Sequence, residues 1–431
     1  SMREMKDSGV ECIGKIQKDW NVCKLKRIAE RLTDGTHGTY ERTSEGYLLL
    51  SAKNVFEDGL HIGENESLIS EEDYQSIISN GFPKKNDVLL CCVGTIGRCT
   101  VYKEKEPIAF QRSVIFIRCN NRMLPSFLNY NLQSPSSLIQ EKLSVNKSAQ
   151  EGIYQVAVKE LQIVLPGIKQ QKQIIDYLDA KCSKINEVIE KQQAIVEKLK
   201  EYKLSVIIET VTKGLNPNVE MKDSGVEWIG QMPTSWDCTT VGMIATVVRG
   251  ASPRPAGDPL YFNGTDVPGI TVAEVTKGDG KYIDGTETFL TFEGAKQSRI
   301  VEEGTLLLSN SGATLGVPKI TRIRGCINDG SVAFYNLSIN QEFLLYLFKG
   351  RTFELRKQMQ GYGQPNLNTT IVKGIEVPLP TELEQKAIVE FLDQKCTAIE
   401  KTIEDREKAI DKLQEYKKSL IYEVVTGKKE V

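Results

Sequence analysis

Clusters of Gly, Ser, Thr, Asn, Gln and Arg follow short apolar runs at several places in this sequence. Arg can read guanine, and Asn or Gln can read adenine, through paired hydrogen bonds, while Ser, Thr and backbone N–H groups hold phosphates. The candidate DNA-contacting residues in the first half are Thr36, His37, Lys53, Asn54, Thr95, Arg98, Gln111 and Arg112. Those in the second half are Arg249, Ser252, Arg254, Ser309, Asn310, Ser311, Asn328, Gln364 and Asn366. Each loop taken alone is also consistent with a plain turn.

No complete set of catalytic or metal-binding residues is found. The sequence has no GxxxxGK[ST] phosphate loop, no GxSxG and no HExxH. Residues 215–218 contain Asn-Pro but lack the Pro-aromatic pair with which amino-methyltransferases grip a flipped base. His37 alone is more typical of an ordinary turn residue than of a general base. We therefore expect no catalytic residue, no metal site and no cofactor bound by this chain.

Composition points to a globular protein of two or three domains. The chain has 431 residues, of which 40% are hydrophobic and 26% charged. Its ten cysteines are scattered without a CxxC pair, which favours free thiols in a reducing compartment. No run of 18 apolar residues and no apolar leader occur, so we expect no membrane association and a cytoplasmic location.

The chain repeats itself. MKDSGVECIG at 5–14 returns as MKDSGVEWIG at 221–230, and the same offset carries Trp20 onto Trp236. LPGIKQQKQIIDYLDAKC at 165–182 returns as LPTELEQKAIVEFLDQKC at 379–396. The segments between, about 31–164 and 247–378, barely resemble each other. This order of variable and shared segments predicts a duplicated half-molecule with a pseudo-twofold plan.

The two shared segments have apolar residues three and four positions apart, without Pro or Gly. This spacing predicts a coiled-coil seam in both copies, with a helix over 171–212 that would be roughly 60 Å long. An antiparallel pairing of the two copies fits best, and a parallel homodimeric coiled coil is the alternative. The predicted seam residues are Leu178, Ile185, Ile189, Val196 and Leu199 in the first copy, and Leu392, Ile399, Ile403, Ile410 and Leu413 in the second.

The variable segments contain short apolar runs bounded by turn residues. Strands are predicted at 47–50, 88–90, 113–117, 305–308 and 331–335, and helices at 70–79 and 341–350. The predicted fold class is α/β (α+β): two mixed α/β domains separated by a long antiparallel two-helix coiled coil. The predicted boundaries are 1–164 and 215–378 for the two domains with their repeat segments, and 165–214 and 379–431 for the two helices.

Taken together, the repeat plan, the helices and the loops resemble the specificity subunit of type I restriction–modification systems. The matching motifs are DGTH at 34–37, GTIG at 94–97, RGASPRP at 249–255, and an LP…EQ…I pattern at Leu379-Pro380, Glu384-Gln385 and Ile388. The first copy departs from this pattern, because it has Gln170-Gln171 where the second has Glu-Gln.

The resemblance implies that each variable segment is a target-recognition domain reading one half of a bipartite, asymmetric double-stranded DNA site. The helices would act as a ruler for the gap and would bind two methylation subunits, which hold S-adenosylmethionine. A restriction and translocation subunit would use ATP and Mg²⁺, and this chain would catalyse nothing. The net charge of −2 is unfavourable for DNA binding, so positively charged side chains must be clustered locally or supplied by the partner subunits. A scaffold without DNA specificity is the alternative function, and the missing motifs argue against a self-sufficient nuclease or methyltransferase.

Overall fold

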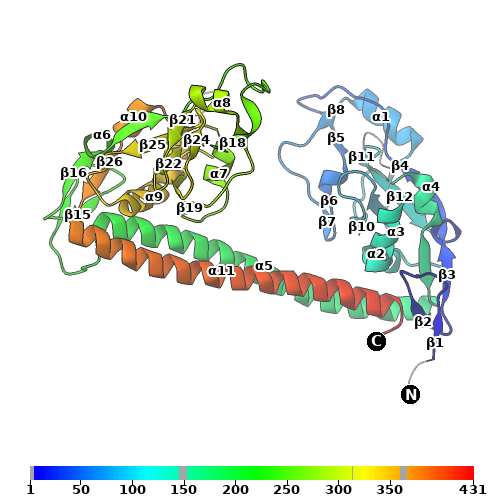
Figure 1. Ribbon diagram of the computed structural model, residues 1–431. Helices are drawn as coiled ribbons and strands as arrows, with labels where there is room; N and C mark the ends of the chain where they lie inside the picture. Colours follow the sequence, from blue (N-terminus) through cyan, green and yellow to red (C-terminus); the bar gives the residue numbers. More distant parts are fainter. Residues whose placement is uncertain (1–3, 145–152, 313, 360–365) are drawn as a thin grey trace. The chain divides into compact units, whose positions relative to one another are not determined.

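The computed structural model describes residues 4–144, 153–312, 314–359 and 366–431 (Figure 1). The chain divides into two compact units: unit 1 is Ser1–Gln193 with Glu407–Val431, and unit 2 is Ala194–Arg406. Two long helices, α5 (Ile168–Lys213) and α11 (Glu382–Val425), contribute a segment to each unit. Because α5 begins in unit 1 and α11 ends there, the two helix segments in each unit run antiparallel.

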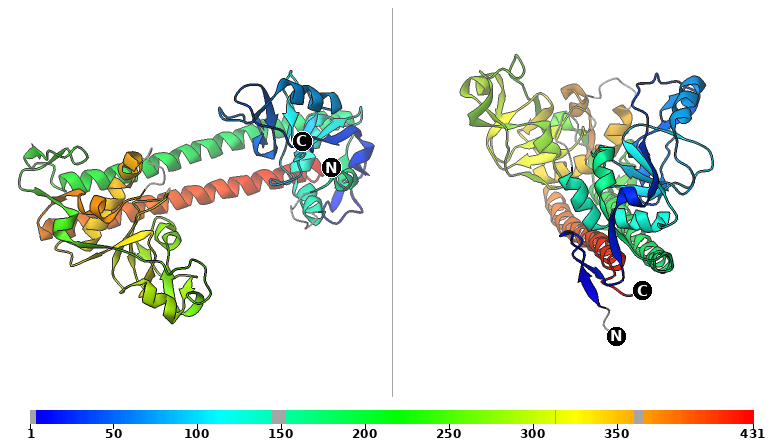
Figure 2. Two further views of the ribbon diagram at one scale, coloured as in Figure 1. Left: turned by 90° about the horizontal axis from the view of Figure 1, so that it is seen from above. Right: turned by 90° about the vertical axis from the view of Figure 1, so that its right-hand side faces the viewer.

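Within each unit the two helix segments lie side by side and bury their seam (Figure 2). In unit 1, Leu178 and Cys182 share a core with Leu420 and Val424. In unit 2, the core formed by Ile207 and Val211 of α5 includes Val389, Leu392 and Cys396 of α11. All ten predicted seam residues are buried or half-buried. Each buried Leu or Ile stabilises the fold by roughly 1.5–3 kcal/mol. The predicted fold class, with mixed domains and an antiparallel helix pair, is confirmed.

The domain of unit 1 is built on an antiparallel sheet in the order β10–β9–β12–β4. Its strands are β4 (Ala29–Asp34), β9 (Val88–Cys91), β10 (Cys99–Val101) and β12 (Val114–Cys119). A second sheet, β11–β5–β8, holds β5 (Tyr47–Leu50), β8 (Leu68–Ile69) and β11 (Ala109–Phe110). Paired short strands are β1 (Met5–Asp7) with β2 (Lys15–Gln17), β3 (Asn21–Lys24) with β13 (Gln162–Leu165), and β6 (Val55–Phe56) with β7 (Gly59–Leu60). The helices are η1 (Leu25–Arg27), η2 (Ala52–Asn54), α1 (Glu71–Asn80), α2 (Pro125–Gln133), α3 (Pro135–Leu143) and α4 (Gln155–Glu160).

The domain of unit 2 repeats this plan with the sheet β17–β25–β22–β23–β19. Its strands are β17 (Thr246–Arg249), β19 (Tyr282–Ile283), β22 (Leu306–Ser309), β23 (Pro318–Thr321) and β25 (Ser331–Tyr335). A second sheet holds β18 (Phe262–Ile270), β20 (Phe289–Leu290), β21 (Arg299–Val301) and β24 (Gly325–Ile327). Paired short strands are β14 (Met221–Asp223) with β15 (Gln231–Pro233), and β16 (Asp237–Thr240) with β26 (Glu376–Leu379). The helices are α6 (Val241–Ile244), α7 (Val272–Thr276), α8 (Phe292–Gln297), α9 (Gln341–Met359) and α10 (Thr369–Lys373).

The central strands β9 and β22 are apolar except for Ser309, and both of their faces are covered. In β9, Val88 and Leu90 belong to the core that faces the helices, while Leu89 and Cys91 belong to a second core on the other face. Side chains of a strand point alternately to its two faces, so a strand buried on both sides reads as a continuous apolar run rather than as an alternation. This is why the runs at 88–90 and 305–308 could be recognised.

The repeat extends into the variable segments through bonds that attach each domain to its long helix. Gln171 Oε1 accepts a hydrogen bond from Leu124 N at 2.8 Å, and Gln385 Oε1 accepts one from Asn340 N at 2.7 Å. Both glutamine side chains are buried. The two domains therefore share one framework although their sequences have diverged. Among the described residues, no helix combines the length and the apolar character that crossing a membrane requires.

Candidate nucleic-acid interface

Three loops meet at one end of the central sheet of unit 1. They follow β4 (residues 34–37), follow β9 (residues 92–98) and precede β12 (residues 111–113). Thr36 N donates to Phe110 O at 2.7 Å and Arg112 N donates to Thr36 O at 2.9 Å, while Cys92 N donates to Ser113 O at 2.9 Å. Backbone hydrogen bonds thus bring Thr36 next to Gln111 and Arg112, which lie far from it in the sequence.

The same three loops occur at the same end of the sheet in unit 2. They follow β17 (residues 249–254), follow β22 (residues 310–312 and 314–316) and precede β25 (residues 328–330). Gly250 N donates to Ser331 O at 2.9 Å, Ala251 N donates to Ile327 O at 3.1 Å, and Asn310 N donates to Gly330 O at 2.9 Å. The two units therefore present polar residues from equivalent positions.

One glycine in each unit allows the first loop to pass close to the third. A Cβ placed on Gly35 would overlap the carbonyl oxygen of Phe110, and one placed on Gly250 would overlap that of Asn328. Only glycine lets the backbones approach this closely. The DGTH and RGAS motifs therefore share a structural reason, although their polar residues differ.

In unit 1 the side chains of Arg112 and Thr95 are exposed, and the His37 side chain is 65% exposed. His37 Nε2 lies 2.8 Å from Asp34 Oδ2, and Asp34 Oδ1 accepts a hydrogen bond from Gln155 Nε2 at 2.6 Å. These bonds fix the His37 ring on its loop. Charged and polar donors of this kind are suited to phosphates and to base edges.

In unit 2, Asp329 organises three of the predicted residues, two through its carboxylate and one through its backbone oxygen. Ser252 Oγ donates to Asp329 Oδ1 at 2.6 Å, and Arg254 Nη2 lies 3.5 Å from Asp329 Oδ2. Arg249 Nε donates to the backbone oxygen of Asp329 at 2.9 Å. Both arginines are exposed, so Asp329 orients them without burying them. The sequence prediction did not include Asp329, and its place between Asn328 and Gly330 in a polar turn is the signal that could have identified it.

Asn310 lies beneath this group of loops and is fully buried. Neither its side-chain oxygen nor its side-chain nitrogen has a hydrogen-bond partner, and the same holds for the side-chain oxygens of Asn328 and Asn366. Ser311 and Asn366 form an isolated bridge across this place, while Gln364 lies outside the described residues. These side chains form a polar interior just below the loops. Each unpaired buried polar group costs about 1–3 kcal/mol of folding free energy.

Besides Asn310, two more of the predicted residues are not available at the surface. Asn54 is buried, and its Nδ2 donates to Glu66 Oε1 at 2.7 Å, while its Oδ1 accepts from Ser51 N at 3.1 Å. Ser309 is buried, and its Oγ donates to Thr314 O at 2.8 Å. Both hold turns in shape, so we leave them out of the proposed interface.

Arg98 and Lys53 are committed to contacts within unit 1. Arg98 Nη2 donates to Ala52 O at 2.7 Å, and its guanidinium lies 4.3 Å from the centre of the Phe56 ring. Lys53 Nζ lies 2.8 Å from Glu66 Oε2, although the Lys53 side chain remains 60% exposed. Arg98 therefore supports the loop after β9 from behind, and contact with DNA would require Lys53 to exchange its partner.

Nothing in the described residues resembles a metal centre or a reactive thiol. No group of three or more His, Cys, Asp or Glu side chains within these ranges could hold a metal ion. All ten cysteines are free. Burial raises the pKa of the Cys92 thiol to about 12, with a further contribution from nearby Asp34. This thiol therefore stays protonated and unreactive at neutral pH.

Comparisons with known proteins agree with this architecture. The family described as "Type I restriction modification DNA specificity domain" matches residues 17–198 and 233–407. A Methanocaldococcus jannaschii protein provisionally named as the MjaX type I restriction enzyme specificity subunit is 25% identical, covering 96% of this chain and 95% of its own. The MjaVIII specificity subunit of the same organism is 24% identical, covering 96% of this chain and 94% of its own.

A solved structure shares the fold over nearly the whole length. It comes from work on complex assembly and conformational transition of the type I restriction–modification system, has a TM-score of 0.68 at 16% identity, and covers 95% of this chain and 98% of its own. The two family matches span both domains and most of both long helices. The chain belongs to the family of type I restriction–modification DNA specificity subunits, as the repeats and motifs had indicated.

Proposed function

We propose that this chain reads a bipartite, asymmetric double-stranded DNA site, with one half read by the unit 1 domain and the other by the unit 2 domain. One observation carries the proposal: equivalent loops on one shared framework present different polar side chains. Unit 1 offers Thr36, Gln111 and Arg112 where unit 2 offers Arg249, Ser252 and Asn328. Different donors and acceptors in the same place would select different bases.

The proposed contacts rely mainly on the arginines. A guanidinium that makes two hydrogen bonds to guanine discriminates against a wrong base by about 1–3 kcal/mol. Asp329 holds Arg249 and Arg254 in exposed positions in unit 2, and Arg112 is the exposed arginine of the equivalent loop in unit 1. These residues gather positive charge at one end of each sheet, which supports DNA binding by a chain whose net charge is −2.

The remaining proposals concern assembly. Exposed apolar side chains recur seven residues apart on α5, at Val188, Ile195 and Tyr202, and Tyr416 of α11 is exposed as well. Such a stripe supports docking of partner helices, which we assign to two methylation subunits, with a restriction and translocation subunit joining them. S-adenosylmethionine, ATP and Mg²⁺ would be held by those partners in a cytoplasmic complex, and this chain would be a non-catalytic subunit without a cofactor of its own.

Selection of bound sequences from a random double-stranded DNA pool, with the methylation subunits present, tests the reading function. The native chain should recover two short motifs with a fixed gap. Arg112→Ala should relax one motif only, and the double change Arg249→Ala with Arg254→Ala should relax the other only. Arg324→Ala, at the opposite end of the unit 2 sheet and paired with Glu302 at 3.0 Å, is the control and should change neither.

Three results would overturn the proposal. They are a single contiguous motif, arginine changes in the two units that relax the same motif, and partner binding without any sequence preference. The last result would favour the scaffold function.

The proposed role of the two helices as a ruler has its own test. One extra heptad in both α5 and α11 should lengthen the gap and leave both motifs unchanged, and an unaltered gap would contradict this role.

A further inference from the structure

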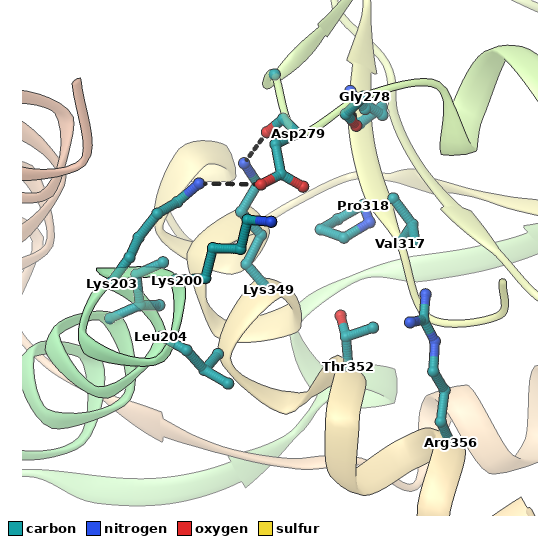
Figure 3. A pocket seen from close by; sticks show the side chains of 13 residues that line it. Lys200, Lys203, Leu204, Gly278, Asp279, Val317, Pro318, Lys349, Thr352 and Arg356 are labelled. Atoms are coloured by element: carbon teal, nitrogen blue, oxygen red, sulfur yellow. Dashed lines mark hydrogen bonds and ion pairs between the residues drawn. The ribbon is translucent and has the colours of Figure 1, made fainter. Parts of the chain in front are cut away.

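A basic pocket of about 230 Å³ lies in unit 2 between α5, α9 and the loop that precedes β19 (Figure 3). Five of the residues that line it are cationic: Lys200, Lys203, Lys319, Lys349 and Arg356. Its lining within the described residues contains one carboxylate, that of Asp279. A water molecule takes up about 30 Å³ in the liquid, so the pocket has room for a group of several non-hydrogen atoms.

The cations are held close together by the fold. Lys319 is 2% exposed, and its Nζ donates to the backbone oxygens of Lys277 and Gly278, both at 3.1 Å. Lys203 is 8% exposed, and its Nζ lies 3.2 Å from Asp279 Oδ2. A lysine is rarely this buried unless its charge is balanced.

The one carboxylate in the described lining of the pocket, that of Asp279, is committed to Lys203, and Lys200 pairs with Glu197 at 3.0 Å. Lys203 Nζ also lies 2.8 Å from Glu400 Oε1, whereas Lys349 Nζ donates to the backbone oxygen of Asp279 at 2.7 Å. Burial above all, together with repulsion from Lys203 and Lys319, lowers the pKa of Lys349 to about 8, although the nearby carboxylates of Glu400 and Asp279 act to raise it. Burial also lowers the pKa of Lys319. The pocket therefore holds positive charge that is incompletely balanced, and an anion would relieve it.

Unit 1 shows that the fold does not need these cations. Lys417 occupies in α11 the place that Lys203 has in α5, and it pairs with Glu57 of the unit 1 domain at 2.7 Å. The other matched positions in unit 1 are neutral. Tyr130 and Tyr346 are equivalent residues, since each donates a hydrogen bond to an aspartate of a long helix, Asp179 or Asp393. Gln133 follows Tyr130 at the same spacing at which Lys349 follows Tyr346, so it occupies the position of Lys349. Thr100 occupies the position of Lys319, because Thr100 pairs with Leu89 in the unit 1 sheet as Lys319 pairs with Leu307 in the unit 2 sheet. Gln414 occupies the position of Lys200 in the repeat of the two long helices.

We propose that this pocket of unit 2 binds a phosphate group. Lysine and arginine are the side chains that proteins use for phosphates, and Figure 3 shows Lys200, Lys203 and Lys349 gathered on one side of the pocket with Arg356 and Thr352 on another. The phosphate could belong to a free ion or nucleotide, or to a DNA backbone that passes along α5. Both sources share one chemistry, and the inference does not depend on any reading of DNA sequence.

Calorimetric titration of the full-length chain with inorganic phosphate, at constant ionic strength, is the first arm of the test. The native chain should bind one phosphate. The double variant Lys200→Gln with Lys349→Gln, which installs the residues of unit 1, should bind at least tenfold more weakly. The single variant Lys349→Arg keeps the positive charge at this position and should retain most of the native affinity. Lys386→Gln, an exposed lysine of α11 paired with Glu382, is the matched control and should behave as the native chain.

The second arm distinguishes the sources by measuring the affinity for a double-stranded oligonucleotide of arbitrary sequence against salt concentration. If DNA supplies the phosphate, the double variant should lose affinity, reduce the salt slope by about one and no longer respond to competing phosphate. If a free phosphate is the ligand, DNA binding should be unchanged while the first arm shows its tenfold loss. A double variant that equals the native chain in both arms would overturn the proposal, provided its circular dichroism shows that it is folded.

Discussion

The first turns of α5 and α11 differ at several positions, and the pair Gln170 and Glu384 predicts unequal stability of the two copies. In α11, Glu384 Oε1 accepts a hydrogen bond from the indole Nε1 of Trp236 at 3.0 Å, while Oε2 accepts from Thr381 N at 2.9 Å, as in a capping box. In α5 the matching residue is Gln170, whose Oε1 accepts from Gly167 N at 3.2 Å. The matching indole, Trp20 Nε1, is buried without a hydrogen-bond partner.

Replacing Glu384 by Ala should therefore be costly. A hydrogen bond to a charged group contributes about 1.5–3 kcal/mol, and loss of a helix cap costs about 0.5–2 kcal/mol. Because the two effects share one side chain and overlap, we expect Glu384→Ala to lower the free energy of unfolding by about 2–4 kcal/mol. Glu382→Ala is the matched control: this carboxylate is exposed and pairs with Lys386, so its removal should lower the free energy of unfolding far less. Gln170→Glu should gain about 1 kcal/mol by offering Trp20 a charged acceptor.

Urea unfolding followed by tryptophan fluorescence measures these changes, since Trp20 lies in unit 1 and Trp236 in unit 2. The pH dependence supplies an independent check. Burial raises the pKa of Glu384, but hydrogen bonds from Trp236 and Thr381 outweigh this and lower it overall. The stabilisation is thus complete above the ordinary glutamate pKa and is lost as the pH falls below it. A loss equal to that of Glu382→Ala, or one that stays constant from pH 7 to pH 3, would refute the reasoning.

Three further predictions follow from buried or crowded groups. Burial raises the pKa of Glu141 to about 8, and neither of its carboxylate oxygens has a hydrogen-bond partner, so stability should fall as the pH rises from about 4.5 to 8. Glu141→Gln should remove this loss, which amounts to about 1.4 kcal/mol per unit of pKa shift. The variant should therefore raise the thermal midpoint at pH 8.5 but hardly at pH 5, and equal midpoint changes at the two pH values would contradict the prediction. Gly35→Ala should destabilise by about 2–4 kcal/mol in urea and weaken DNA binding, whereas Gly63→Ala, which has room for its Cβ, should be nearly neutral. Sulfate, which does not titrate, should bind the basic pocket more weakly as the pH rises from 7 to 9, because Lys349 loses its proton; a flat calorimetric profile would count against this.

The framework could be predicted from the sequence because its signals are local. The strands at 47–50 and 331–335 coincide with β5 and β25, since apolar runs between turn residues depend only on neighbouring positions. The heptad seam gave both long helices to within a few residues, as α5 begins at Ile168 and not at residue 171. The helix predicted at 341–350 continues to Met359, because Gly350 is tolerated where it packs against Ile207 and Ile208 of α5.

The loops were harder, because the role of a polar side chain there depends on residues distant in the sequence. Asn54 and Arg112 look alike as polar loop residues. However, Glu66 and Ser51 draw Asn54 into the interior, while Arg112 stays exposed. Lys203 and Lys417 stand at equivalent positions of the two helices, and they pair with carboxylates of the domains, at Asp279 and Glu57. Such partners come from tertiary contacts, which no periodicity encodes.

The positions at which the two copies have diverged support the view that the loops carry the function. The central strands β9 and β22 are fully buried, so their sequences stay apolar apart from Ser309, and Gln171 and Gln385 make equivalent backbone contacts in the two units. At the sheet end, by contrast, Gly35 and Gly250 are constrained by backbone crowding, whereas exposed positions such as Arg112 and Arg249 fill no part of the core. A duplicated framework with freely variable ends can present two unrelated sets of donors and acceptors. An asymmetric DNA site requires this of its reader, whereas a symmetric protein scaffold would not.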